Sequence, residues 1–274
     1  MPEGPEIKQA ANRIAKAIEG KVCDEIFFAF DHLQHFEDEF LGKEIISVKP
    51  RGKALLIRFE NDLTIYSHNQ LYGRCVIRNR GNFPKTNRQL RLAIHNQKKS
   101  ALLYSASDIE VLTNDEIANH PFLSNLGPDI LDEETDVALI RERLRDPKYE
   151  RRRLGHLLLD QKWLSGLGNY LRSEILFVAK LSYDIRPKDL TKTESAKLAK
   201  IIHKLTVQAY ETRGITNNLR VAKKMKADGY RRSQYRHYVF ARAGRQCYEC
   251  GEIIEKLYVG SRRLYICSQC QMGE

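Results

Sequence analysis

The spacing of apolar residues changes near residue 127, and this change narrows the folds open to the chain. From residue 22 to residue 113, short apolar runs alternate with turn signals such as Arg51-Gly52 and Arg80-Gly81. Short runs separated by turns are typical of antiparallel strands packed as a sandwich. The runs cover residues 25–30, 44–48, 54–59, 63–67, 74–78, 89–95 and 101–104. We therefore predict an N-terminal antiparallel β-sandwich flanked by helices.

Beyond residue 127 the apolar spacing becomes helical. Apolar positions in 137–145 and 198–205 recur at helical intervals, and Thr191-Lys192-Thr193-Glu194 has the capping-box pattern of a helix start. A turn bearing Gly166 and Gly168 interrupts another helical stretch. We predict an α+β chain divided into an N-terminal domain 1–127, a helical domain 128–237 and a terminal unit 238–274.

The stretch 215–235 is basic, carries Asn217, Asn218 and Gly229, and has little apolar period. We predict a mobile loop that lies over a bound polyanion. Residues 238–241 are expected to open a terminal strand.

Four cysteines near the end of the chain form the most specific motif. The spacing is Cys247-x2-Cys250-x16-Cys267-x2-Cys270. Each C-x2-C pair places two thiolates on one tight turn. Two such turns across a hairpin provide four thiolates for a closed, structural zinc site. The alternative is four free cysteines that share this spacing by coincidence. Six cysteines are too few for a disulfide scaffold in a chain of 274 residues, so Cys23 and Cys75 are expected to be buried small hydrophobes.

The charge balance points to a polyanionic partner. The chain has 46 Lys and Arg against 35 Asp and Glu, a net charge of +11, and a pI near 9.3. A basic surface without a long basic run most often binds nucleic acid and less often an anionic membrane. No apolar run is long enough to span a bilayer and no signal peptide is recognisable. We expect a cytoplasmic monomer with no membrane partner.

The opening residues combine a possible nucleophile with an acid. An initiator methionine before a small residue is normally removed, which would leave the secondary amine of Pro2 beside the Glu3 carboxylate. A terminal amine titrates near pH ~8, against ~10.4 for lysine, and it condenses with an aldehyde to an iminium. The alternative is a helix start with Gly4 as the N-cap, Pro5 first in the helix and Glu3 facing the helix dipole.

Two candidates for phosphate binding lie in the second half of the chain. Arg262 and Arg263 sit at or near the tip of the cysteine hairpin, where a guanidinium can fork onto a phosphate. Asn169 follows Gly166 and Gly168 at the start of a helix, where free amides form an anion site. The alternatives are a solvated arginine pair, and an asparagine that merely caps its helix.

Two further candidates lie in the sandwich. Lys53 follows the Arg51-Gly52 turn at the start of an apolar strand and is either functional or simply solvated. Gln70, Leu71 and Tyr72 belong to a polar and aromatic loop that can wedge into a base stack or pack over the sandwich rim.

Taken together, these motifs resemble the bacterial formamidopyrimidine-DNA glycosylase and endonuclease VIII family. The opening Met-Pro-Glu, the Arg-Gly-Lys strand start, the Gly-Leu-Gly-Asn turn, and an arginine five residues before the third cysteine of a four-cysteine finger occur in the family's order. The runs 1–7, 66–73 and 103–110 resemble the endonuclease VIII branch specifically. One departure is the stretch 215–235, which is longer than expected for that branch and leaves the base preference open.

The resemblance implies a β-sandwich, a helix-two-turns-helix domain with a zinc-finger hairpin, and double-stranded DNA with oxidised bases or abasic sites as the partner. It implies a bifunctional glycosylase and lyase of base excision repair that removes oxidised pyrimidines through a Schiff base on the N-terminal proline and cleaves the strand by β,δ-elimination. Pro2 would be the nucleophile and Glu3 the acid/base. The remaining site residues would grip phosphates or fill the gap left by an extruded base: Lys53, Asn169 and Arg262 in the first role, and Gln70, Leu71 and Tyr72 in the second.

Two rival functions stay open from the sequence. One is a formamidopyrimidine-DNA glycosylase with the same Pro2 chemistry but oxidised purines as substrates. The other is a non-catalytic zinc-finger DNA-binding protein in which Pro2 and Glu3 only begin a helix.

Overall fold

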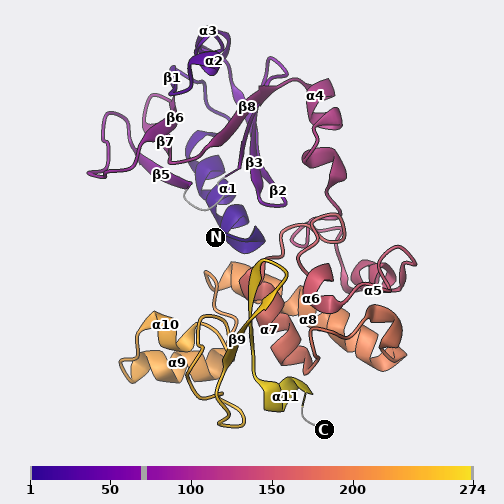
Figure 1. The fold of residues 1–274 in the computed structure, drawn as a ribbon. Coiled ribbons are helices and arrows are strands. Elements are labelled where there is room, and N and C mark those ends of the chain that lie inside the picture. Colours follow the sequence, from indigo (N-terminus) through magenta and orange to yellow (C-terminus); the bar gives the residue numbers. More distant parts are fainter. Residues whose placement is uncertain (1, 69–72, 273–274) are drawn as a thin grey trace. The chain divides into compact units, whose positions relative to one another are not determined.

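A computed structural model describes residues 2–68 and 73–272. The chain divides into two compact units, Met1–Asn125 and Leu126–Glu274 (Figure 1).

The first unit is a sandwich of two four-stranded sheets. The sheet orders are β1-β6-β7-β5 and β2-β3-β4-β8, and every strand pair is antiparallel. The strands are β1 (Glu25–Phe28), β2 (Ile45–Arg51), β3 (Ala54–Phe59), β4 (Thr64–His68), β5 (Arg74–Asn79), β6 (Leu90–His95), β7 (Lys99–Tyr104) and β8 (Asp108–Leu112). The predicted β-sandwich is confirmed, and β8 is a strand that the sequence reasoning did not assign.

Helix α1 (Gly4–Ile18) packs into the core of this sandwich. Its buried apolar residues Ile7, Ala11, Ile14 and Ile18 recur three to four positions apart, so they line one face of the helix. The core joins Ala11, Ile14 and Ile18 to apolar side chains of both sheets: Phe28, Leu92, Ile94, Ile45, Ile57, Phe59 and Ile65. Burial of that face therefore fixes the helix against both sheets. The shorter helices are α2 (Asp31–Gln34), α3 (Glu37–Phe40), α4 (Asn114–Asn119) and the 3-10 turn η1 (Leu123–Asn125).

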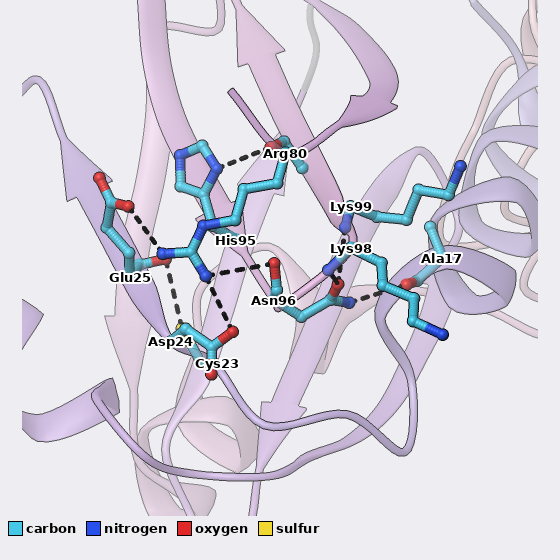
Figure 2. Close-up of polar contacts among 10 residues, drawn as sticks. Ala17, Cys23, Asp24, Glu25, Arg80, His95, Asn96, Lys98 and Lys99 are labelled. Carbon is cyan, nitrogen blue, oxygen red and sulfur yellow. Dashed lines mark hydrogen bonds and ion pairs between the residues drawn. The ribbon is translucent and has the colours of Figure 1, made fainter. Parts of the chain in front are cut away.

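A polar network holds the C-terminal end of α1 (Figure 2). The Asn96 amide donates to the Ala17 carbonyl at 2.9 Å, one of the last-turn carbonyls that the helix itself cannot satisfy. The oxygen of the same amide accepts from the backbone of Lys98 and Lys99 at 3.0 and 2.8 Å. Arg80 donates to Asp24 at 3.0 Å. Arg80 also donates to the Asn96 carbonyl at 3.5 Å. The hairpin between β6 and β7 is thereby tied to α1 through Asn96 and, through Arg80, to the residue before β1.

The second unit is helical and carries a two-stranded hairpin. Its helices are α5 (Val137–Arg145), α6 (Leu154–Leu157), α7 (Asn169–Ala179), the 3-10 turn η2 (Pro187–Asp189), α8 (Lys192–Glu211), α9 (Leu219–Ala227), α10 (Arg232–Tyr235) and α11 (Ser268–Met272). The hairpin pairs β9 (Glu255–Val259) with β10 (Arg262–Ile266). Thr191 caps α8 with the predicted capping box. The core surrounds the fully buried Trp163 and includes Leu264 and Ile266 of the hairpin.

Two predictions for this unit were wrong. The stretch 215–235 is not a loop, because it contains α9 and α10. Residues 238–241 form bends and a turn instead of a strand. A buried carboxylate explains that turn: Glu174 accepts the backbone N–H groups of Tyr238, Val239 and Phe240 at 2.8, 2.8 and 2.9 Å. Three N–H groups converging on one carboxylate replace the ladder that a strand would supply.

The same carboxylate extends into a buried chain of side chains. Thr216 donates its hydroxyl to Glu174 at 2.5 Å and lies 2.8 Å from Nδ1 of His237. Because the threonine proton is used by Glu174, its oxygen accepts from His237, so Nδ1 carries the ring proton. Burial lowers the pKa of His237 to about 2, helped by the charges of Arg236 and Arg232. The imidazole is therefore neutral at neutral and mildly acidic pH.

This neutral histidine predicts an acid-dependent loss of stability. Its unfolded pKa is near ~6.5, so below that pH the unfolded chain takes up a proton that the folded chain does not. The contribution of neutral His237 to the free energy of unfolding is fully present above pH ~6.5. It falls by up to ~1.4 kcal/mol per pH unit below that pH. Urea unfolding at pH 6.5 and 5.5 should show a loss about 1 kcal/mol larger in the wild type than in His237→Asn. Equal losses in the two proteins would contradict this account.

Candidate active site and metal centre

The start of α1 holds a buried acid. Glu3 is the N-cap, its backbone is extended, and the helix begins at Gly4, so the predicted N-cap at Gly4 was one residue late. The Glu3 N–H donates to Oε2 of Glu6 at 3.0 Å, which is one half of a capping box. Glu3 is only 3% exposed. A carboxylate is favoured at this position by the positive end of the helix dipole.

A pocket of about 530 Å³ lies between α1 and β5, and Pro2 is part of its wall. The α1 side contributes Glu6 and Arg13, and the β5 side contributes Arg74 and Arg78. The pocket is therefore rich in cations, with an acid beside the proline. The sequence had assigned Glu6 only to the first turn of a helix; its place in the pocket follows from the helical spacing of Glu6, Ala10 and Arg13, which face the same side of α1.

Lys53 occupies the two-residue turn between β2 and β3. Arg51 and Ala54 are paired across this turn, and Gly52 adopts a φ of 60° at its first central position. That conformation favours glycine and closes a tight hairpin. Lys53 therefore lies at the end of the sheet, next to the pair formed by Ala54 and His68.

His68 ends β4 at the same edge of the sheet. Burial lowers its pKa; the charge of Asp108 opposes the shift, and that of Lys53 adds to it. The ring stays neutral at pH 7 because both the burial and the lysine disfavour a second positive charge. The predicted wedge, Gln70, Leu71 and Tyr72, follows His68 in the sequence and lies outside the described residues.

In the second unit, Asn169 is the first residue of α7. Its predicted alternative role as the helix cap is wrong, because the N-cap is Gly168. The preceding turn is organised by Gln161, whose side chain accepts from Gly166 N–H at 3.1 Å and donates to the Leu167 carbonyl at 3.0 Å. These bonds hold the glycine turn, and with it the start of the helix, in one conformation.

A buried arginine connects the start of α7 to the hairpin. Arg172 is 0% exposed. Its guanidinium donates to the carbonyl of Gly155 at 2.7 Å and to that of Arg263 at 2.8 Å. Next to it, Ser173 accepts the N–H of Tyr265 at 3.2 Å. Arg262, the first residue of β10, is thereby held within the same frame as Asn169, one helical turn before Ser173.

The four cysteines of the finger lie together. Their sulfur atoms are all within 4.8 Å of one another. Cys247 and Cys270 are 3.9 Å apart, and Cys250 and Cys267 are 3.4 Å apart. Four sulfurs at ~2.3 Å from a tetrahedral zinc are separated by roughly 3.8 Å, so the spacing fits a metal ion. It is too long for a disulfide, whose bond is about 2.05 Å.

Burial disfavours the ionised form of two thiols in this cluster. Burial raises the pKa of Cys270 to about 11 and raises that of Cys267 further. A backbone N–H of Glu252 lowers the pKa of Cys250. Without a cation the thiols of Cys267 and Cys270 keep their protons at neutral pH. A bound metal would displace those protons, and its affinity would therefore fall as the pH falls.

Comparison with known proteins decides the family. The formamidopyrimidine-DNA glycosylase N-terminal domain matches residues 1–106, and the H2TH domain of the same enzyme matches residues 126–221. Endonuclease 8 of Escherichia coli O6:K15:H31 is 42% identical over 271 residues, which cover 99% of this chain and 100% of that protein. The chain belongs to the formamidopyrimidine-DNA glycosylase family. It is a base-excision-repair DNA glycosylase and AP lyase.

The fold of this glycosylase agrees with solved structures of the family. A Lactococcus lactis Fpg mutant in complex with Fapy-dG containing DNA superposes with a TM-score of 0.80 at 22% identity, covering 99% of this chain and 100% of that chain. MutM in complex with carbocyclic 8-oxo-G containing DNA superposes with a TM-score of 0.78 at 24% identity, covering 99% and 100%. These matches confirm the predicted fold class. Within residues 2–68 and 73–272 of the glycosylase, no helix has the length and hydropathy to cross a membrane.

Proposed function

We propose that this glycosylase excises oxidised pyrimidines from double-stranded DNA through a Schiff base on Pro2 and then cleaves the strand by β,δ-elimination. One observation carries the proposal: Glu3 is buried at the N-cap of α1, and Pro2, the residue before it in the chain, is part of the wall of a pocket. An acid held beside an amine is what sugar opening and iminium formation require. Removal of Met1 would expose that amine.

The first step forms a bond between the Pro2 nitrogen and C1′ of the damaged nucleotide. The bond from C1′ to the base breaks, and the base leaves with the electron pair. Glu3 donates a proton to the ring oxygen as the sugar opens, which leaves an iminium between Pro2 and C1′. The now acidic C2′ proton is lost and the 3′ phosphate departs. Loss of a second proton expels the 5′ phosphate, and hydrolysis of the iminium returns the amine.

The nucleotide must leave the helix before this chemistry can begin. Extrusion costs a few kcal/mol, and least for a damaged base. We assign Lys53, Asn169 and Arg262 to the phosphates around the lesion, because basic and amide donors that hold a kinked backbone offset the cost of extrusion. We assign Gln70, Leu71 and Tyr72 to the gap left in the stack.

The metal of the finger is proposed to be one structural zinc ion, held by Cys247, Cys250, Cys267 and Cys270. A closed set of four thiolates leaves no position for water, so zinc would crosslink the finger without entering the reaction. We place the enzyme in the bacterial cytoplasm with the nucleoid.

The preference for pyrimidines rests on the opening residues and on the Gln70-Leu71-Tyr72 loop, both of which resemble endonuclease VIII. The test measures base release in single-turnover assays on three matched duplexes. One carries an oxidised pyrimidine, one a ring-saturated pyrimidine and one an oxidised guanine. We expect the two pyrimidines to be released faster than the guanine. Equal or reversed rates would move the protein to the purine-directed branch, and the absence of release from all three would leave a non-catalytic DNA-binding protein.

A further inference from the structure

Helices α9 and α10 form a cationic hairpin that the proposed reaction does not use (Figure 1). Residues 218–232 contain six arginines and lysines and one acid, a balance of +5 in a chain whose total is +11. The cationic side chains of this hairpin are exposed. Nearly half of the net positive charge therefore lies on fifteen residues.

The hairpin is built to keep one shape. Asn218 caps α9 by accepting the N–H groups of Arg220 and Val221 at 2.9 and 3.3 Å. At the other end, Gly229 has a φ of 83°. The N–H of Tyr230 donates to the Met225 carbonyl at 3.0 Å, and that of Gly229 donates to the Lys226 carbonyl at 3.2 Å. This pair of bonds is a Schellman motif, which ends a helix in a defined reversal.

The base of the hairpin is closed by its own backbone. The Arg236 carbonyl accepts from the N–H groups of Thr216 and Asn217 at 2.9 and 3.2 Å. The buried Asn217 amide donates to the Tyr235 carbonyl at 3.1 Å. The segments that lead into and out of the hairpin are thus bonded to each other. Because the hairpin is already ordered, little conformational entropy is lost when a ligand binds it.

The charges on α9 form a stripe. Arg220, Lys223 and Lys224 lie three and four positions apart, so they share one face of the helix. Ala222, the one buried residue of α9, points to the opposite side. The packing of Ala222 therefore directs the three cations outward together.

We propose that this stripe binds the phosphate backbone of duplex DNA and enlarges the DNA contact beyond the residues that surround the lesion. The inference takes DNA as the ligand from the proposed function, and it does not depend on Pro2 chemistry. Charge complementarity favours a polyanion with closely spaced charges, and B-DNA carries one charge per ~1.7 Å of helix axis.

The test is the salt dependence of binding to an undamaged duplex of about thirty base pairs, measured by fluorescence anisotropy on the full zinc-loaded chain. The variant carries three substitutions together, Arg220→Gln, Lys223→Gln and Lys224→Gln. Glutamine removes the charge and has a helix propensity close to that of arginine and lysine. The slope of log affinity against log salt should become shallower by about 2 to 3, and affinity at ~0.1 M salt should fall by roughly 10- to 100-fold. Circular dichroism should be unchanged.

A matched control removes three exposed lysines from α8: Lys192→Gln with Lys197→Gln and Lys204→Gln. It has the same net charge as the α9 variant and should retain the wild-type slope to within ~1. An equal loss of DNA affinity and of salt slope in the two variants would overturn the proposal, because the effect would then depend on total charge and not on the position of the charges. Wild-type DNA affinity combined with lost binding to phosphatidylglycerol vesicles would also overturn it and assign the stripe to a membrane.

Catalysis separates this inference from the proposed function. At saturating DNA, single-turnover base release by the α9 variant should equal that of the wild type, because the stripe touches no reacting atom. An inactive wild type that still showed the α9-dependent slope would refute the Pro2 mechanism and leave this inference standing.

Discussion

A chain that retains Met1 ahead of Pro2, or carries an N-terminal extension, should neither release a damaged base nor form a covalent adduct with DNA. The amine of Pro2 would then be an amide nitrogen, whose lone pair is delocalised and cannot attack C1′. Borohydride reduces an iminium to a stable amine. The wild type should therefore give a trapped enzyme–DNA band on a denaturing gel, and the blocked chain should give none. A trapped adduct from the blocked chain would move the nucleophile elsewhere, with Lys53 the first candidate.

Glu3→Gln should separate the two activities. Glutamine keeps the size of the buried side chain but cannot donate the proton that opens the sugar. Base excision should drop by ~10²-fold or more, as expected for the loss of a general acid/base. Cleavage at a preformed abasic site should survive in part, because that aldehyde is already open some of the time. Equal loss of both activities, with DNA affinity and fold intact, would contradict this division of roles.

Local sequence signals predicted most of the fold. The box at Thr191 and Glu194 sets the start of α8, and both partners lie within four residues of one another. Alternating apolar runs and turns similarly give seven of the eight sandwich strands. The missed strand, β8, carries Asp108 and Glu110 among its five residues, and its place in the sheet depends on pairing with β4.

Helix α9 was missed for a related reason. A surface helix is recognised by its apolar face, and only Ala222 is buried in this one. Its ends could nevertheless be recognised from the sequence, because asparagine is a preferred N-cap residue and glycine commonly follows the last turn of a helix. In this chain these residues are Asn218 and Gly229. Weighing those caps together with the spacing of Leu219, Ala222 and Met225 would have predicted the helix.

The candidate site divides in the same way. The cysteine cluster was predicted because each knuckle is local and the spacing is specific. The contacts that position the other residues could not be predicted from local sequence, because they join distant parts of the chain. Arg172 reaches Arg263 across 91 positions, and Glu174 reaches Phe240 across 66. Tertiary packing alone brings such partners together.

On the proposed assignment of zinc to the finger, Cys267→Ser should release the metal and disorder the cysteine-bearing turns. Cys267 is fully buried, and its sulfur lies 3.4 Å from that of Cys250. A small apolar cluster of Phe177, Val239, Ile254 and Tyr265 joins the finger to α7, and such a cluster is too small to order the cysteine-bearing turns without a crosslink. Structural zinc contributes ~10 to 16 kcal/mol in finger peptides, so the variant should lose on the order of 5 kcal/mol or more of unfolding free energy.

Two matched variants make this result interpretable. Cys75→Ser alters a cysteine outside the cluster and should keep one zinc per chain by atomic emission. Arg262→Ala should also keep the metal and the unfolding midpoint, because its backbone carbonyl still accepts from Arg172, yet it should weaken DNA binding through the lost phosphate contact. Since Arg262 begins β10 and Cys267 follows directly after that strand, loss of zinc should impair DNA binding at least as much as Arg262→Ala does. A zinc-free Cys267→Ser protein with wild-type DNA affinity would show that the finger does not present Arg262 to DNA.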